Sequence, residues 1–179
     1  MVLICPPPLF HTQTTHVCLH HLAALCPDPA HKAINIHFPL CMHHIQHGIN
    51  DIIHPVGTDV NPFRPWSDLP TVEEMQKGVE ELYVEPSKAL GLKVWSGTLL
   101  PIYGWRTYNE DREAMRNAFN EWLRNSEIFD GCIDFDAAVC DADAPRAFAP
   151  GFDSGDHLHP SEKAYEAMAQ AAWEQISEE

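Results

Sequence analysis

The chain has 179 residues, enough for one compact domain with a sizeable core, and its 45% hydrophobic and 21% charged residues are typical of a globular protein. Its formal net charge of −15 at pH 7 opposes binding to nucleic-acid phosphates or to anionic membrane surfaces. No apolar run approaches the roughly 18–20 residues of a membrane-spanning helix, so we expect neither a nucleic-acid partner nor a membrane span.

Residues 1–47 differ in composition from the rest of the chain. They hold nine of the twelve histidines and four of the six cysteines, but no glycine or serine. Apolar residues alternate over 34–40 as on a half-buried strand, although Pro39 would restrict such a strand to a sheet edge. Three interpretations stay open: a piece added by a wrong gene model, a poorly ordered lead-in, or a metal-binding segment. The irregular His and Cys spacing makes the metal interpretation the least favoured.

From residue 48 onwards helix and strand signals alternate, which predicts an α/β layered fold. Thr71-Val72-Glu73-Glu74 has the capping-box pattern and predicts a helix to about residue 84. A further turn is expected to about residue 90, where Gly91 ends it. Residues 92–95 then predict a buried strand.

The second half of the chain predicts two longer helices around a short strand. Thr107-Tyr108-Asn109-Glu110 is a second capping-box pattern, residues 132–135 indicate a strand, and Ser161 begins a last helix. Apolar residues at helical spacing predict the core-facing side of each helix. These residues are Met115, Ala118, Phe119, Trp122 and Leu123 in the first, and Tyr165, Met168, Ala172 and Ile176 in the last.

Two short motifs contain groups suited to acyl transfer. Gly48-Ile49-Asn50-Asp51 stands where a strand would end, and Asp156-His157-Leu158-His159-Pro160 precedes the last helix. A carboxylate three residues before an imidazole can bind one ring nitrogen and leave the other free as a base. The Asn50 amide can donate to a developing oxyanion, an interaction whose removal costs about 2.7–4 kcal/mol in transition-state stabilisation. Either motif alone is also common in ordinary turns.

Further pieces of sequence stand in order around these motifs. They are Gly48-Ile49-Asn50-Asp51-Ile52, Gly97-Thr98-Leu99-Leu100-Pro101, Arg116 with Asn120 and Trp122, Phe129-Asp130-Gly131 with Asp134-Phe135-Asp136, and Gly155-Asp156-His157-Leu158-His159-Pro160 with Tyr165-Glu166-Ala167-Met168-Ala169. With these pieces, residues 48–176 resemble the SGNH (GDSL-like) ester hydrolases. The resemblance is closer to their lysophospholipase-like or acetylxylan-esterase-like branch.

The resemblance implies a flavodoxin-like three-layer α/β/α sandwich, N-terminally incomplete in this chain, over residues 48–179. Residues 1–47 would then lie outside the fold. It also implies hydrolysis of acyl or acetyl esters of lipids or carbohydrates, with no cofactor and no metal. By position, Asn50 corresponds to the oxyanion-hole asparagine, His159 to the general base and Asp156 to its orienting acid. His157 matches no catalytic position, so we interpret it as a loop residue.

The nucleophile is the part of this family pattern that we do not find. The family's Gly-Asp-Ser block precedes the Gly-x-Asn-Asp motif, but here the first serine is Ser67 and the first glycine is Gly48. Neither Ser96 nor Ser154 stands in an elbow sequence that would expose its hydroxyl to an imidazole. We therefore expect at most trace esterase activity. Without the central first strand of a flavodoxin-like sheet, we also expect the strand before Gly48 to have an exposed edge. The alternatives are a non-catalytic binding relative and, less favoured, a metal-binding protein.

Overall fold

The computed structural model describes residues 42–45, 48–55 and 69–177. The strand predicted over 34–40, and the His and Cys residues behind the metal hypothesis, lie outside the described residues. The range Cys41–Glu179 forms one compact unit and is described here by itself. None of its described helices is both long and apolar enough to cross a bilayer.

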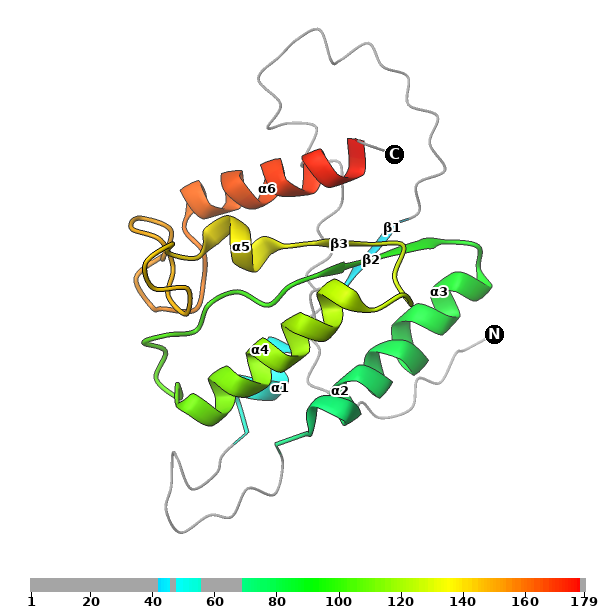
Figure 1. Cartoon of the computed structure of the whole chain (residues 1–179), viewed down its shortest axis with the longest axis horizontal. Coiled ribbons are helices and arrows are strands. Elements are labelled where there is room, and N and C mark those ends of the chain that lie inside the picture. The colour runs from blue at the N-terminus through cyan, green and yellow to red at the C-terminus, as the bar shows by residue number, and fades with distance from the viewer. Residues whose placement is uncertain (1–41, 46–47, 56–68, 178–179) are drawn as a thin grey trace, which may run out of the picture. The chain divides into compact units, whose positions relative to one another are not determined.

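The described strands form a small parallel sheet in the order β1-β2-β3 (Figure 1). They are β1 (Met42–Ile45), β2 (Lys93–Gly97) and β3 (Gly131–Ile133). β1 pairs with β2, and β2 with β3, both in parallel. Although β1 lies within the segment that the sequence placed outside the fold, its pairing makes these four residues part of the sheet. β1 also ends just before the Gly48 motif, where a strand end was expected.

The helix predicted from Thr71 is present and runs without interruption to Ala89. It consists of α2 (Val72–Val79), η3 (Glu80–Val84) and α3 (Glu85–Ala89). Thr71 caps it with the predicted reciprocal capping box to Glu74. The middle piece is a π-helical stretch, and Pro86 follows it in the first turn of α3. A wider turn accommodates a proline, which lacks the N–H of a regular helix and would clash with the preceding turn.

The remaining helices are α1 (Ile49–Ile53), α4 (Glu110–Asn125), α5 (Phe135–Val139) and α6 (Glu162–Ser177). The capping box predicted at Thr107 is wrong, because Asn109 caps α4 and accepts from the Arg112 N–H. The hydroxyl of Thr107 instead donates to the Ile53 carbonyl at 2.8 Å. The strand predicted over 132–135 ends at Ile133, since the Asp134 side chain caps α5.

Helices pack on both faces of the sheet (Figure 1). On one face, α1, α2, η3 and α4 share a core with Val94 of β2. On the other, α5 and α6 pack against Trp95 of β2 and Ile133 of β3. Adjacent residues of a strand point to opposite faces, which explains why Val94 and Trp95 belong to different cores.

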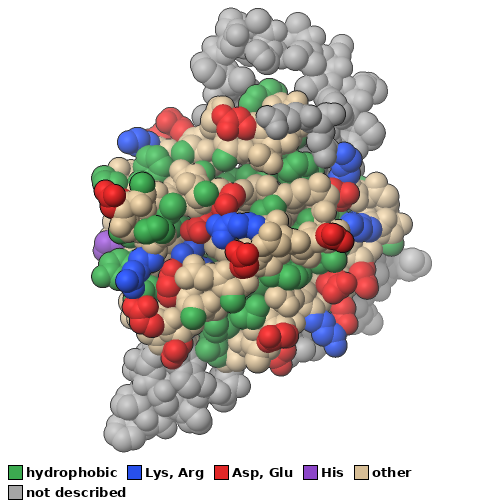
Figure 2. All heavy atoms as spheres, viewed as in Figure 1, with side chains coloured by type: hydrophobic (Ala, Val, Ile, Leu, Met, Phe, Trp, Pro, Cys, Tyr) green, Lys and Arg blue, Asp and Glu red, His purple; other side chains and the backbone are tan. Residues whose placement is uncertain are grey.

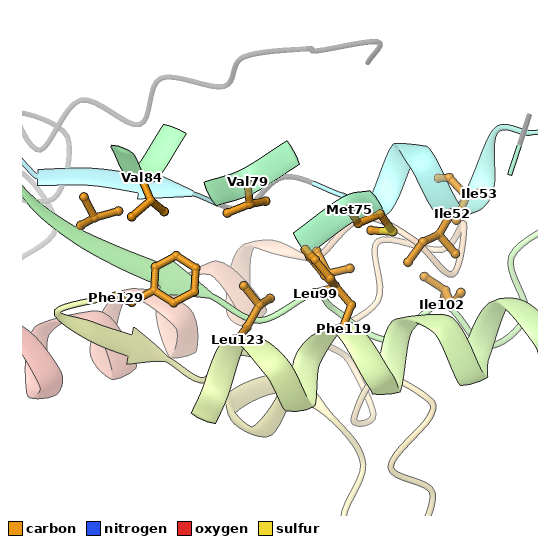
Figure 3. Close-up of a cluster of buried hydrophobic side chains, with 11 residues drawn as sticks. Ile52, Ile53, Met75, Val79, Val84, Leu99, Ile102, Phe119, Leu123 and Phe129 are labelled. Carbon is orange, nitrogen blue, oxygen red and sulfur yellow. The ribbon is translucent and has the colours of Figure 1, made fainter. Parts of the chain in front are cut away.

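The larger core lies between α4 and the elements that face it (Figure 3). Phe119 and Leu123, both predicted as core, are buried there, whereas Ala118 is exposed. On α6, Met168 and Ala172 are buried as predicted, but Tyr165 is 55% exposed, so its assignment to the inner face is wrong. Figure 2 shows acidic side chains spread over the viewed face, not gathered in one patch.

Candidate active site

The two residues predicted to act as base and orienting acid meet in the loop before α6. Nδ1 of His159 lies 2.5 Å from Oδ2 of Asp156. The other oxygen of this carboxylate, Oδ1, accepts from the backbone N–H groups of Leu158 at 3.0 Å and His159 at 2.9 Å. The three-residue spacing therefore produces the predicted carboxylate–imidazole pair.

The hydrogen bonds to Asp156 determine its charge. The backbone N–H and the imidazole of His159 hold the pKa of this carboxyl well below its ordinary value. An ionised carboxylate can only accept, so the facing Nδ1 of His159 must carry a proton. Nε2 is then the ring nitrogen that can act as a base. The His159 side chain is 65% exposed, which leaves it open to a reacting partner.

This depressed pKa predicts how the Asp156 contribution to stability depends on pH. The ionised form is favoured in the folded state, so the contribution is present above the unfolded-state pKa of about 3.9 and is lost as pH falls further. We expect the difference between the unfolding midpoints of the wild type and Asp156→Asn, measured by thermal denaturation, to begin to shrink below about pH 4 and to go on shrinking down to about pH 2. A difference that stays constant over this range would contradict the prediction.

Backbone hydrogen bonds close the loop onto the start of α6. The N–H of Ser154 donates to the His159 carbonyl at 3.0 Å, and the N–H of Ser161 donates to the Phe152 carbonyl at 2.7 Å. The hydroxyl of Ser161 donates to the Gly151 carbonyl at 2.7 Å and also accepts from the N–H of Ala164 in the first turn of α6. The helix end therefore supports the loop that carries His159.

A second carboxylate–imidazole pair lies in the same loop and was missed from the sequence. Oδ2 of Asp153 is 2.6 Å from Nδ1 of His157, a residue that the family pattern leaves without a catalytic role. Oδ1 of Asp153 accepts from the backbone N–H groups of Gly155 at 2.8 Å and His157 at 2.9 Å. The sequence signal was the Asp-x-x-x-His spacing that overlaps the Asp-x-x-His motif.

Asn50 lies on α1, which begins directly after Gly48. Gly48 has φ of +121°, and a Cβ there would lie 2.9 Å from the Met75 side chain. Its carbonyl accepts from the N–H groups of Asp51 and Ile52, so this glycine turn starts the helix that carries Asn50. Among the described residues, no hydrogen bond joins Asn50 to the Asp156–His159 pair.

Three hydrogen bonds fix the end of α1 against the start of α4 and the segment just before it. The guanidinium of Arg112, which is fully buried, donates to the carbonyls of Ile52 and Pro55. Thr107 Oγ1 donates to the Ile53 carbonyl. The segment that contains Thr107 also includes Gly104, which packs against the ring of His157. The loop after β2 thus lies between the Asn50 helix and the His159 loop.

Neither alternative serine is placed to attack with His159. Ser96 is fully buried in β2, and its hydroxyl donates to the Leu123 carbonyl at 3.1 Å. The Ser154 hydroxyl is exposed but contacts Oδ1 of Asp156 at 3.3 Å and makes no described hydrogen bond to the imidazole. The described residues also contain no group of three or more His, Cys, Asp or Glu side chains suited to a metal ion.

An ion-pair network, buried around Arg116, joins α4 to the start of α5. Arg116 of α4 donates to Glu113 at 2.7 Å, to Asp136 at 2.7 Å and to the Leu99 carbonyl at 3.1 Å. Arg124 bridges Asp134 and Asp136 at the start of α5. Burial alone would lower the pKa of Arg116, but its bonds to Glu113 and Asp136 raise it. The network connects α4 to the chain segments that follow β2 and β3.

A parallel sheet with helices on both faces defines this chain as an α/β protein. Its candidate site lies in loops at the carboxyl ends of the strands, as is usual for this class. The chain belongs to the GDSL-like lipase/acylhydrolase family, whose model matches residues 31–172. This match begins inside the segment 1–47. Among curated proteins, none matches the chain.

Three solved structures share this fold. A protein from Bacteroides fragilis NCTC 9343 assigned to the acylhydrolases matches with a TM-score of 0.56 and 17% identity over 76% of this chain. A GDSL-like lipase from Bacteroides thetaiotaomicron VPI-5482 matches with 0.50 and 17% over 75%. A Desulfitobacterium hafniense DCB-2 protein assigned to the G-D-S-L family of lipolytic proteins matches with 0.51 and 19% over 73%. The chain spans 61% of the length of each of the three.

Proposed function

We propose that this chain carries the base and the oxyanion donor of an SGNH-type hydrolase that acts on carboxylic esters. The observation that supports this most strongly is the 2.5 Å contact between His159 Nδ1 and Asp156 Oδ2. Asp156 orients the imidazole, His159 moves the proton through Nε2, and Asn50 donates to the oxyanion that forms on the ester carbonyl. No step in this scheme requires a cofactor or a metal ion.

The substrate class follows from family membership. GDSL-like lipases and acylhydrolases imply acyl or acetyl esters, and the lipid and carbohydrate esters of the lysophospholipase-like and acetylxylan-esterase-like branches are our proposed substrates. We also propose that β1, β2 and β3 are the third, fourth and fifth strands of a flavodoxin-like order, with the segment 1–47 outside that fold except for β1.

We further propose that the chain has at most trace activity, because neither Ser96 nor Ser154, the described serines considered as nucleophiles, is placed to attack with His159. The contacts of Ser96 and Ser154 support this, as does the absence of serine and glycine from residues 1–47. A site with a base and an oxyanion donor but no nucleophile favours a second candidate function, which is the binding of an ester ligand by a non-catalytic relative. Such a relative would keep the fold and the Asp–His loop without turnover.

A fluorophosphonate, which reacts only with an activated serine, distinguishes these possibilities. Intact-mass analysis of the treated chain is expected to show no added mass. An added mass that His159→Ala abolishes would contradict the missing nucleophile and support full esterase activity, and peptide mapping would locate the serine. An added mass that His159→Ala leaves in place would show that the reacting serine does not use this base.

A further inference from the structure

The loop from Asp153 to His159 contains two nested carboxylate–imidazole pairs. Asp153 bonds the backbone N–H groups of Gly155 and His157, the residues on either side of Asp156. Its side chain is 21% exposed, half the 42% of Asp156. Asp153, the less exposed of the two carboxylates, therefore holds the stretch of backbone that carries Asp156. From that backbone the more exposed Asp156 contacts His159.

The ring of His157 connects this loop to the segment after β2. A Cβ added to Gly104 would lie 2.8 Å from Cγ of the His157 ring, closer than non-bonded carbons approach. Gly104 also has φ of +94°, so both its conformation and its neighbour require glycine. The imidazole thus packs directly on the backbone of the turn at Gly104.

The backbone of His157 is itself in an unfavourable conformation. Its φ is +64°, and it is the one described residue other than glycine with a positive φ. A residue with a Cβ takes this conformation at a cost, which surrounding contacts must offset. The bond from Asp153 to the His157 N–H, the 2.6 Å contact to its Nδ1 and the packing on Gly104 are the contacts that do so.

We propose that Asp153 and His157 are positioning residues, which hold the Asp156–His159 loop against the turn at Gly104. The proposal deepens and rests on the assignment of His159 as the base. A base that moves by about 1 Å can lose roughly 10²-fold in rate, so an exposed loop needs such anchors. Asp153 fixes the loop internally, and the ring of His157 fixes it to the segment that also bonds α1 through Thr107.

The test reads the protonation of His159 directly. In ¹⁵N-labelled full-length chain, the ring nitrogen shifts of His159 report whether Nδ1 or Nε2 carries the proton. We expect the Nδ1–H form in the wild type and a mixture of both forms in Asp153→Ala. Asp153→Asn, which keeps an oxygen for the backbone N–H groups, should restore part of the wild-type signal. Asp141→Ala is the matched control, because Asp141 also bonds a backbone N–H two residues on but has no described contact to an imidazole.

A second variant covers the case in which Asp153→Ala does not fold. His157→Asn suits a positive φ and leaves the backbone bonds of Asp153 possible, but it removes the ring from Gly104. It should also mix the two protonated forms of His159 and lower the residual hydrolysis of an activated ester by roughly 10-fold to 100-fold. An unchanged His159 spectrum in folded His157→Asn and in folded Asp153→Asn would overturn the proposal.

A double-mutant cycle tests the contact between His157 and Gly104. Gly104→Ala should displace the His157 ring and change the His159 spectrum, and this change should be smaller in the His157→Asn background. Equal changes in both backgrounds would overturn the role of the contact. Failure of the underlying function looks different: if Asp156→Asn leaves the His159 spectrum unchanged, then the Asp156–His159 assignment is wrong.

Discussion

Replacement of Arg116 with methionine is expected to lower the free energy of unfolding by about 3–5 kcal/mol. The Arg116 side chain is 2% exposed, and its partners Glu113 and Asp136 are 8% and 13% exposed. Methionine removes the guanidinium that neutralises these two carboxylates and also leaves the Leu99 carbonyl without one of its donors. Water cannot hydrate the carboxylates left without a partner, because Glu113 and Asp136 are both largely buried. Chemical denaturation of both proteins measures the difference.

The control is an arginine that forms the same kind of pair on the surface. Arg146 bonds Glu110 at 2.9 Å, but the two side chains are 49% and 79% exposed. Exposed pairs contribute little to stability, so Arg146→Met should be much milder than Arg116→Met. Adding Glu113→Leu to Arg116→Met removes one stranded carboxylate and should recover part of the loss. A change in Arg116→Met no larger than in Arg146→Met would contradict a structural role for the network.

The centre of this network, at Arg116, is buried, but apolar periodicity in the sequence does not predict its burial. The stripe predicted on α4 places Phe119 and Leu123 in the core correctly, because apolar burial drives that face. It also places Ala118 there, although Ala118 is exposed. Arg116 and Asn120 are buried instead, and paired charged or amide groups on a helix give no apolar signal. Their cost of burial is offset in part by Glu113 on the same helix and in part by Asp136 and Leu99 from other segments, and the order of residues does not reveal these distant partners.

Cap residues show a similar limit. Thr71 and Glu74 form the predicted box because both partners lie within one turn. Thr107 and Glu110 have the same pattern, but the Thr107 hydroxyl is taken by the carbonyl of Ile53, 54 positions away in the chain. Because the Thr107 hydroxyl bonds Ile53, it is not available as a cap, and Asn109 caps α4 instead. Local spacing was sufficient only where no distant group competed.

Contacts within the loop of the candidate site could be predicted from the sequence. Contacts between this loop and distant segments could not. Asp156 and His159 meet because three residues separate them in one turn, and the sequence contains that spacing. The pairing of Asp153 with His157 is equally local, but His157 matches no catalytic position in the family pattern. The contact between His157 and Gly104 joins two distant loops. No local pattern encodes it, since a glycine in a loop is compatible with many neighbours.

Replacement of His159 with alanine is expected to reduce the residual hydrolysis of an activated aryl ester by about 10²-fold or more, because general-base catalysis contributes about 10²–10⁴-fold. The Asp156 carboxylate keeps the proton on Nδ1, so Nε2 is the atom that would take a proton from the attacking water. Asp156→Asn should also lower the rate, since an amide no longer enforces that protonated form. Initial rates of the purified variants, corrected for buffer hydrolysis, measure both effects.

His54→Ala is the matched control for His159→Ala, because His54 is also exposed but lies at the end of α1 and outside the proposed machinery. It should retain the wild-type rate. Free imidazole added to His159→Ala should restore part of the lost rate, because the small base can occupy the space of the missing ring. A folding defect would not respond to it. Equal rates in His159→Ala and His54→Ala would show that the residual hydrolysis does not use His159, and would contradict its assignment as the base.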